Sequence, residues 1–177
     1  MTSIRPARDA DMGAVADLWH EGWHDGHAGH VPGGLTAART LAAFHERTPP
    51  RVADTTVAVA DDGSLQGFVM VVDDEVEQLF VARSARGAGV AEDLLAEAER
   101  QVAATGHETA WLAVVVGNVR ARRFYERCGW ADRGDLPYEV AAGDQTFVSP
   151  CRRYEKPVRR TPSGADSNSG IVPRTHR

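Results

Sequence analysis

A change in hydrophobic period midway along the chain limits the folds that it can adopt. Before that point, two runs rich in β-branched residues, 55–60 and 65–72, are joined by Asp61-Asp62-Gly63-Ser64, which is typical of a β-hairpin. A third run, residues 75–81, follows after Asp73-Asp74. The three runs predict an antiparallel meander.

After residue 88 the period lengthens from strand-like to helical. The apolar residues of 89–105 recur at helical spacing and share one face: Val90, Leu94, Leu95, Ala98 and Val102. Residues 109–116 are a nearly continuous apolar run, typical of a strand covered on both faces. A strand, a helix and a second strand in this order favour a parallel pair. We therefore expect an α+β fold with a mixed, mostly antiparallel sheet of six to seven strands.

The other segments are expected to complete this sheet and to bring the number of flanking helices to about four. They are a strand at 4–7, a helix that Asp9 or Asp11 caps and that runs through Trp19, helices at 36–47 and 119–127, and strands from 130–132 toward 138–140 and at 146–154.

Composition and charge exclude several classes of protein. The chain has 177 residues, enough for one domain, and its 25 acidic and 20 basic side chains give a net charge of -5. This balance argues against a nucleic-acid-binding protein, which usually carries clustered positive charge. The longest apolar stretches, such as 111–116, are far shorter than the roughly 20 residues that cross a bilayer, so no membrane partner is expected.

The termini and the cysteines indicate location and domain limits. The N-terminus lacks the apolar segment of a secretory signal, so a cytoplasmic location is expected. In that compartment Cys128 and Cys151 are expected to be thiols. Residues 1–156 are expected to form the folded domain, and the polar residues 157–177 a flexible tail.

A turn with two glycines is the strongest local signal for chemistry. The sequence Arg86-Gly87-Ala88-Gly89 opens a helix, where backbone N–H groups lack internal partners and the helix dipole is positive. A phosphate can approach such donors closely, and Arg86 adds a cationic fork. The dinucleotide fingerprint and the Walker-type loop do not match, because the third glycine and the Gly-Lys-Ser or Gly-Lys-Thr ending are absent. A tight turn without a ligand is the alternative.

A second block, residues 111–130, carries a family resemblance. Its matching residues are Asn118 at the end of a strand, then Ala121, Phe124-Tyr125 and Gly129-Trp130, and they accompany Arg86, Gly89 and Ala91 of the turn. This combination strongly resembles the GNAT superfamily of acyl-CoA-dependent N-acyltransferases. The resemblance covers residues 2–156 and implies a sheet whose central parallel strands splay apart.

The resemblance also implies a cosubstrate and a place for it. Acetyl-CoA would lie between the splayed strands, with its pantetheine arm pairing along the backbone near Leu79, Phe80 and Val81. Its pyrophosphate would be held by Arg86 and by the N–H groups of Gly87, Ala88, Gly89, Val90 and Ala91. Asn118 would contact it as well.

Tyr125 stands where family members keep a general acid that protonates the departing thiolate, and a phenol with a pKa of about 10 suits that task. The alternative for Tyr125 is a core aromatic residue.

The attacking amine must lose a proton, and Glu75 occupies the position of the strand glutamate of a number of GNAT enzymes. Glu77 shares its face, because strand side chains alternate, and either carboxylate can act through a water or be merely solvated. A histidine is another candidate base.

The resemblance implies an N-acetyltransferase that moves the acetyl group directly onto a primary amine of a small molecule or peptide, without a covalent acyl-enzyme. A catalytically weak acyl-CoA-binding sensor is the alternative. Ala113 stands where ribosomal-protein N-terminal acetyltransferases of the superfamily have Glu, which disfavours that activity.

The acceptor side is expected near the first helices, which commonly line the acceptor pocket in this superfamily. The candidate contacts are Trp19, Trp23, His24 and His27, with core packing as the alternative. No metal is expected, because three glycines loosen this histidine-rich segment. Many members of the superfamily pair through their last strands, so residues 146–154 are a candidate edge for a homodimer.

Overall fold

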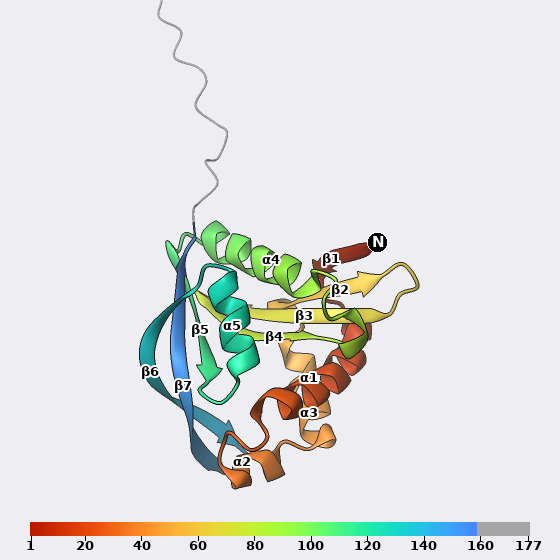
Figure 1. The fold of residues 1–177 in the computed structure, drawn as a ribbon. Coiled ribbons are helices and arrows are strands. Elements are labelled where there is room, and N and C mark those ends of the chain that lie inside the picture. Colours follow the sequence, from red (N-terminus) through yellow and green to blue (C-terminus); the bar gives the residue numbers. More distant parts are fainter. Residues whose placement is uncertain (159–177) are drawn as a thin grey trace, which may run out of the picture.

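The computed structural model describes residues 1–158, and a single seven-stranded sheet organises them (Figure 1). The strands lie in the order β1-β2-β3-β4-β5-β7-β6. Their bounds are β1 Thr2–Pro6, β2 Thr55–Ala60, β3 Leu65–Val72, β4 Glu75–Val81, β5 Thr109–Val115, β6 Ala131–Ala142 and β7 Gln145–Pro157. Every neighbouring pair is antiparallel except β4 and β5. The predicted α+β class and mixed, mostly antiparallel sheet are confirmed.

The β2–β3 hairpin forms where the turn residues predict it. Asp62 accepts hydrogen bonds from the backbone N–H and the hydroxyl of Ser64, at 2.9 and 2.6 Å, and Gly63 adopts a left-handed φ of 85°. A short polar side chain and a glycine therefore supply the tight reversal between the strands.

The parallel pair is joined only at its beginning. The register records one paired position, Glu75 with Trp111, and the Trp111 N–H donates to the Asp74 carbonyl oxygen at 3.0 Å. β4 stays paired with β3, and β5 stays paired with β7 from Thr109 to Val115. Because each strand keeps its other partner, the two strands diverge beyond Trp111 and leave a wedge in the sheet.

Five α-helices cover the two faces within residues 1–158: α1 Met12–His27, α2 Gly33–Ala38, α3 Leu41–Arg47, α4 Val90–Ala104 and α5 Val119–Arg127. Short 3₁₀ turns lie at Asp9–Asp11, Pro49–Asp54 and Arg83–Ala85. α4 and α5 pack on one face of the sheet, and α1, α2 and α3 on the other (Figure 1).

Each face of the sheet has its own apolar core, and the predicted apolar sides of the helices contribute to both cores. Leu94 and Leu95 of α4 are 0% and 2% exposed, so each contributes about 1.5–3 kcal/mol of burial. Val15 and Trp19 of α1 are fully buried on the other side of the sheet. The apolar stripes read at helical spacing therefore point into the two cores.

The predicted helix at 36–47 is wrong in one respect, because it is two helices. Thr40 caps α3 by accepting a hydrogen bond from the Ala43 N–H at 3.2 Å. Arg39, directly before it, has φ -87° and ψ 59°, outside the helical region. The break redirects the chain, and the Arg39 side chain becomes buried at 5% exposure.

The last two strands form a long hairpin that reaches α2 (Figure 1). The strand predicted from 130–132 toward 138–140 is β6, which has a bulge between Asp132 and Gly134. β7 lies between β5 and β6, so residues 151–154 of the candidate edge are paired on both sides, and β6 is the outer strand at this end of the sheet.

The described fold continues past residue 156, the predicted end of the domain. Pro157 is the last residue of β7, and Val158 is 8% exposed and donates its N–H to the Glu108 carbonyl oxygen at 2.8 Å. The remainder of the predicted tail, 159–177, lies outside the described residues. In the described part, no helix has the length and hydropathy needed to span a membrane.

Candidate active site

The glycine turn before α4 presents backbone amides to open space. Gly87 and Gly89 have φ of 78° and 82°, a left-handed conformation that glycine adopts without strain. A Cβ at either position would meet no atom within 4 Å. Gly89 is the N-cap of α4 and has no side chain, so the first amides of the helix keep no side-chain acceptor. The turn can thus donate several hydrogen bonds to one anion.

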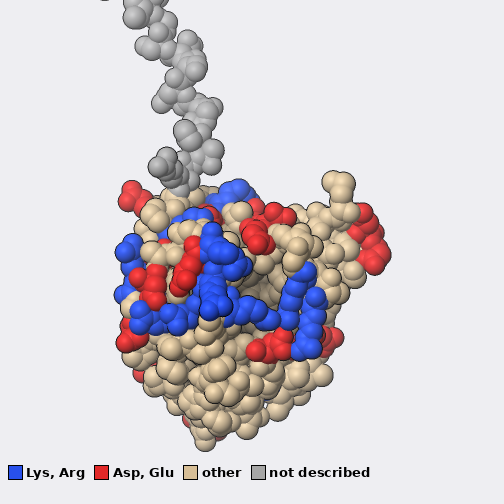
Figure 2. All heavy atoms as spheres, in the orientation of Figure 1, with Lys and Arg blue, Asp and Glu red and all other residues tan. Residues whose placement is uncertain are grey.

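A cavity of about 320 Å³ opens in front of this turn, and we call it the turn cavity. Its lining is Leu79, Val81, Ala85, Arg86, Gly87, Gly89, Val90, Ala91, Glu92, Arg120, Ala121, Phe124, Tyr125 and Arg127. Figure 2 shows Lys and Arg side chains on two sides of a hollow in this face. The cavity is therefore bordered by cations from both the turn and α5.

Most residues predicted to bind acetyl-CoA come together there, with three exceptions. Ala88 does not line the turn cavity, and neither does Phe80, whose ring lies 5.7 Å from that of Phe68 in the core of the other face. Asn118 also lies outside it, because its Oδ1 accepts the Ala121 N–H at 3.2 Å and caps α5. Phe80 and Asn118 instead line the wedge between β4 and β5.

Arg86 is paired in this structure. It donates to Asp25 of α1 at 2.8 Å, and Arg83 donates to the other oxygen of the same carboxylate at 2.6 Å. These hydrogen bonds hold the pKa of Asp25 below its usual range. Arg120 and Arg127 were not among the sequence candidates, although the arginine-rich run of residues 120–127 is a signal for a basic helix face.

A smaller cavity of about 80 Å³, the wedge cavity, lies between β4 and β5. It shares Leu79, Ala121 and Tyr125 with the turn cavity. It shares a second set with a cavity on the opposite face: His27, Glu77, Gln78, Ala113 and Val115. The shared lining places the three cavities in line through the sheet.

Tyr125 lies where the turn cavity and the wedge cavity meet. Its ring packs among Phe124, Trp130 and Tyr154, with ring centroids 5.2, 6.1 and 6.3 Å away, and 9% of the residue is exposed. Its hydroxyl forms no hydrogen bond within residues 1–158. Burial raises the pKa of Tyr125, so the phenol keeps its proton at neutral pH. The side chain can donate that proton into the wedge.

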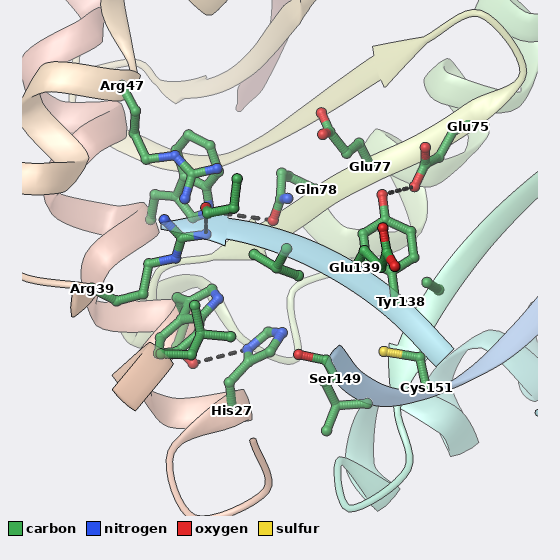
Figure 3. A pocket seen from close by; sticks show the side chains of 17 residues that line it. His27, Arg39, Arg47, Glu75, Glu77, Gln78, Tyr138, Glu139, Ser149 and Cys151 are labelled. Atoms are coloured by element: carbon green, nitrogen blue, oxygen red, sulfur yellow. Dashed lines mark hydrogen bonds between the residues drawn. The ribbon is translucent and has the colours of Figure 1, made fainter. Parts of the chain in front are cut away.

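The third cavity, of about 300 Å³, lies on the face covered by α1, α2 and α3, and we call it the acceptor cavity (Figure 3). Three of the four residues predicted to contact the acceptor line this cavity: Trp19, Trp23 and His27. His24 does not, because its Nε2 lies 2.7 Å from the Arg39 carbonyl oxygen and binds there.

Glu75 and Glu77 both face the acceptor cavity but have different partners (Figure 3). Burial raises the pKa of Glu75, and repulsion from Glu77 and Asp74 raises it further. The Tyr138 hydroxyl donates to Glu75 Oε1 at 2.8 Å and opposes this shift. Glu77 is an ion-pair partner of Arg51. Of these two carboxylates, Glu75 is therefore the one without an ion-pair partner among residues 1–158, which favours it over Glu77 as a base.

His27 is a weak base in this setting. Burial lowers its pKa to about 4, so the ring is neutral at physiological pH. It stacks on Trp23 with centroids 4.8 Å apart, and Nδ1 lies 2.9 Å from the Trp23 carbonyl oxygen. Within residues 1–158 no group of three or more His, Cys, Asp or Glu could hold a metal ion.

Several residues of the acceptor cavity had no signal in the sequence. They are Arg39 in the break after α2, Arg47 in α3, Tyr138 in β6 and Cys151 in β7, and they come from segments about a hundred residues apart along the chain. Burial raises the pKa of Cys151 to about 11, so it is a neutral thiol. Only the folding of the β6–β7 hairpin toward α2 brings this set together.

Comparison with known proteins identifies relatives of the chain. The model of the Acetyltransferase (GNAT) family matches residues 17–130. An uncharacterized N-acetyltransferase of Mycobacterium tuberculosis is 29% identical over 119 residues, 64% of this chain and 75% of the relative.

Solved structures share the fold. Phosphinothricin acetyltransferase of Sinorhizobium meliloti, in complex with acetyl-CoA, has a TM-score of 0.66 at 16% identity and covers 97% of this chain and 96% of its own. PaiA N-acetyltransferase of Thermoplasma acidophilum, in complex with coenzyme A, has a TM-score of 0.64 at 18% identity and covers 89% and 99%.

Proposed function

The chain belongs to the acetyltransferase (GNAT) family, and on that premise we propose that it acetylates the amine of a small molecule or peptide, with Glu75 as the base and Tyr125 as the acid. Membership makes it an acyl-CoA-dependent acetyltransferase with acetyl-CoA as cosubstrate. The observation that carries the proposed roles is the line of three cavities through the sheet, with Tyr125 between the first and the second.

The turn cavity fits the phosphate end of acetyl-CoA. Gly87 and Gly89 leave open space where a phosphate needs to approach, and the amides at the start of α4 are free to donate. Arg86, Arg120 and Arg127 border the same cavity and supply positive charge. To engage a phosphate fully, Arg86 has to leave Asp25.

The wedge fits the arm that carries the acetyl group. β4 is paired with β3 along one edge, while its other edge meets β5 only at Glu75. The backbone of residues 79–81 on that second edge is therefore available to an extended amide-containing arm, as an unpaired strand edge is to a peptide. Bound there, acetyl-CoA presents a thioester carbonyl to an amine in the acceptor cavity.

The proposed proton transfers use residues on the two sides of the wedge. An alkyl amine is mostly protonated at neutral pH and cannot attack in that form. Glu75, directly or through a water, takes a proton from the amine. Tyr125 gives its proton to the departing thiolate. Burial raises the pKa of Tyr125, but it disfavours a thiolate at the same place as well, so the transfer stays balanced.

The side chain at position 113 bears on which acceptors the chain uses. It lines both the wedge cavity and the acceptor cavity, and its methyl group can neither accept nor donate a proton. This agrees with the expectation that the chain is not a ribosomal-protein N-terminal acetyltransferase.

A free-thiol release assay with acetyl-CoA and a panel of amines and peptides tests the proposal. We expect release that depends on the amine, and mass spectrometry of the product then identifies the acetylated group. Calorimetric binding of acetyl-CoA without thiol release for any acceptor would contradict the proposed transfer and favour a sensor.

A further inference from the structure

Two arginines without an acidic partner form one end of the acceptor cavity. Arg39 is 5% exposed, and its Nη2 donates to the Ala141 carbonyl oxygen at 3.2 Å. Its Nε is buried and has no hydrogen-bond partner within residues 1–158. A buried guanidinium N–H without an acceptor is costly, because it has lost water and gained nothing in return.

Arg47 lies close to it and is equally without an anion. Its guanidinium stacks on Trp19, with the central carbon 4.5 Å from the ring centroid, and it forms no hydrogen bond or ion pair in the described chain. Burial lowers the pKa of Arg47 to about 10, and the positive charge of Arg39 contributes in the same direction. Both side chains are charged at neutral pH, so two like charges share this end of the cavity.

The other end of the cavity is acidic. Figure 3 shows Arg39 and Arg47 on one side and Glu75, Glu77 and Glu139 with Tyr138 on the other. Glu77 is paired with Arg51, whereas Glu75 and Glu139 form no ion pair within residues 1–158. Such a cavity complements a ligand that is positive at one end and negative at the other.

We propose that the acceptor is a small amino acid whose carboxylate binds Arg39 and Arg47 while its amine faces Glu75. This inference rests on the proposed acetyl transfer and specifies its substrate class. A carboxylate is planar and accepts two parallel hydrogen bonds, which matches the fork of a guanidinium. The volume of about 300 Å³ is at the lower limit for ligand pockets, which favours a small molecule over a protein segment.

Matched acceptors test the proposal. A series of ω-amino acids of increasing chain length is compared with the amides of the same acids, and kcat/KM is measured by thiol release. We expect the acid to exceed its amide by at least about tenfold at the best length, the usual effect of a hydrogen bond to a charged group. Equal kcat/KM for acids and amides at every length would overturn the proposal and leave the proposed acetyl transfer intact.

Arg39→Met assigns the preference to a residue. The ratio of acid to amide is expected to fall toward one, and Arg47→Gln is expected to reduce it as well. Arg100→Met is the matched control, because Arg100 lies on the exposed side of α4, paired with Glu97, and should keep the wild-type ratio. A wild-type ratio retained in both Arg39→Met and Arg47→Gln would overturn the assignment.

Two further measurements separate binding from folding and from transfer. The melting temperature of Arg39→Met is expected to equal or exceed that of the wild type, because an uncompensated buried charge is removed. N-acetyl derivatives of the same amino acids are titrated into the protein by calorimetry. They are expected to bind the wild type at least about tenfold more tightly than Arg39→Met. No binding of any of these carboxylates to the wild type would overturn the proposal, even if no amine in the panel is acetylated.

Discussion

The turn cavity and the acceptor cavity lie on opposite faces of one sheet and are built differently. The turn cavity consists of residues 79–92 and one helix, α5, and its donors are backbone amides and exposed arginines. The acceptor cavity takes side chains from α1, α2, α3, β4, β5, β6 and β7. Of its charged residues, Arg39 is buried, Arg47, Glu75 and Glu77 are half-buried, and Glu139 is exposed.

Under the proposed function, the turn cavity holds the cosubstrate and the acceptor cavity holds the amine, and the two depend differently on side chains. Backbone amides at a helix start present the same donors whatever the neighbouring side chains are. A cavity lined by side chains from seven elements changes with single substitutions. Under the proposed function, acceptor specificity is therefore encoded in the acceptor cavity and not in the turn cavity.

The strongest test of this division is Tyr125→Phe, at the junction of the two regions. The single-turnover rate is expected to fall about 100-fold, the usual contribution of a positioned acid. Binding of acetyl-CoA should change little, and the melting temperature should not fall, because the hydroxyl has no hydrogen-bond partner in residues 1–158. Tyr154→Phe is the control: it removes a phenol bound to Glu126 and Arg122 instead. An unchanged single-turnover rate in Tyr125→Phe would remove the acid assignment.

Glu75→Gln should affect the acceptor side alone. We expect kcat at saturating amine to fall by at least about tenfold, with little change in acetyl-CoA affinity. Glu77→Gln is the comparison, since Glu77 is an ion-pair partner of Arg51 and should lose stability more than turnover. If Glu77→Gln lowers kcat and Glu75→Gln does not, the two roles are reversed.

The pH profile checks the same residue. The base must be ionised, so activity should rise with pH through the raised pKa of Glu75. Tyr138→Phe removes the hydrogen bond that favours the ionised form, so the acid limb should move to higher pH. An acid limb that moves to lower pH in Tyr138→Phe would point to another base. So would an acid limb that is still present in Glu75→Gln.

Gly89→Ala should affect the turn cavity alone. A methyl group there enters the open space in front of α4 and disfavours the left-handed φ of 82°, so KM for acetyl-CoA is expected to rise about fivefold. Gly63→Ala is the matched control, because Gly63 has φ of 85° and equally open surroundings in the β2–β3 turn. Both variants should lose similar stability. An equal rise of KM in both would show that strain, not access, is responsible.

The smallest expected effect is that of salt concentration, which should differ between the turn cavity and the acceptor cavity. Arg120 and Arg127 are exposed, and raising the salt concentration from 0.05 to 0.5 M is expected to raise KM for acetyl-CoA about threefold. The preference for acids over amides depends on the buried Arg39 and should change less. An equally steep loss of that preference would contradict the assignment to a buried site.

Much of the fold could be predicted because its signals are local. Asp62 and Gly63 define the hairpin turn, and the apolar residues of α4 repeat at helical spacing. The break at Arg39 and Thr40 was not predicted, because residues 36–47 have helical periodicity on both sides of it. The cap at Thr40 and the packing of Leu35 and Phe44, 1% and 0% exposed, favour two short helices over one.

The residues of the candidate site also differ in whether a local sequence signal predicted them. Gly87, Gly89 and Arg86 were predicted from a short motif, and Tyr125 and Glu75 from the family resemblance. Arg39 and Tyr138 were not, because a lone arginine or tyrosine carries no local mark of burial. Arg39 becomes part of the cavity through the helix break and the carbonyl of Ala141, 102 residues further along the chain.

The sequence by itself determined the meander, the crossover and the glycine turn, because spacing along the chain dictates which backbone groups stay unpaired. The tertiary structure decided the acceptor cavity. Its charges come from segments that approach only when the β6–β7 hairpin folds toward α2, and their energies depend on burial, which spacing does not encode.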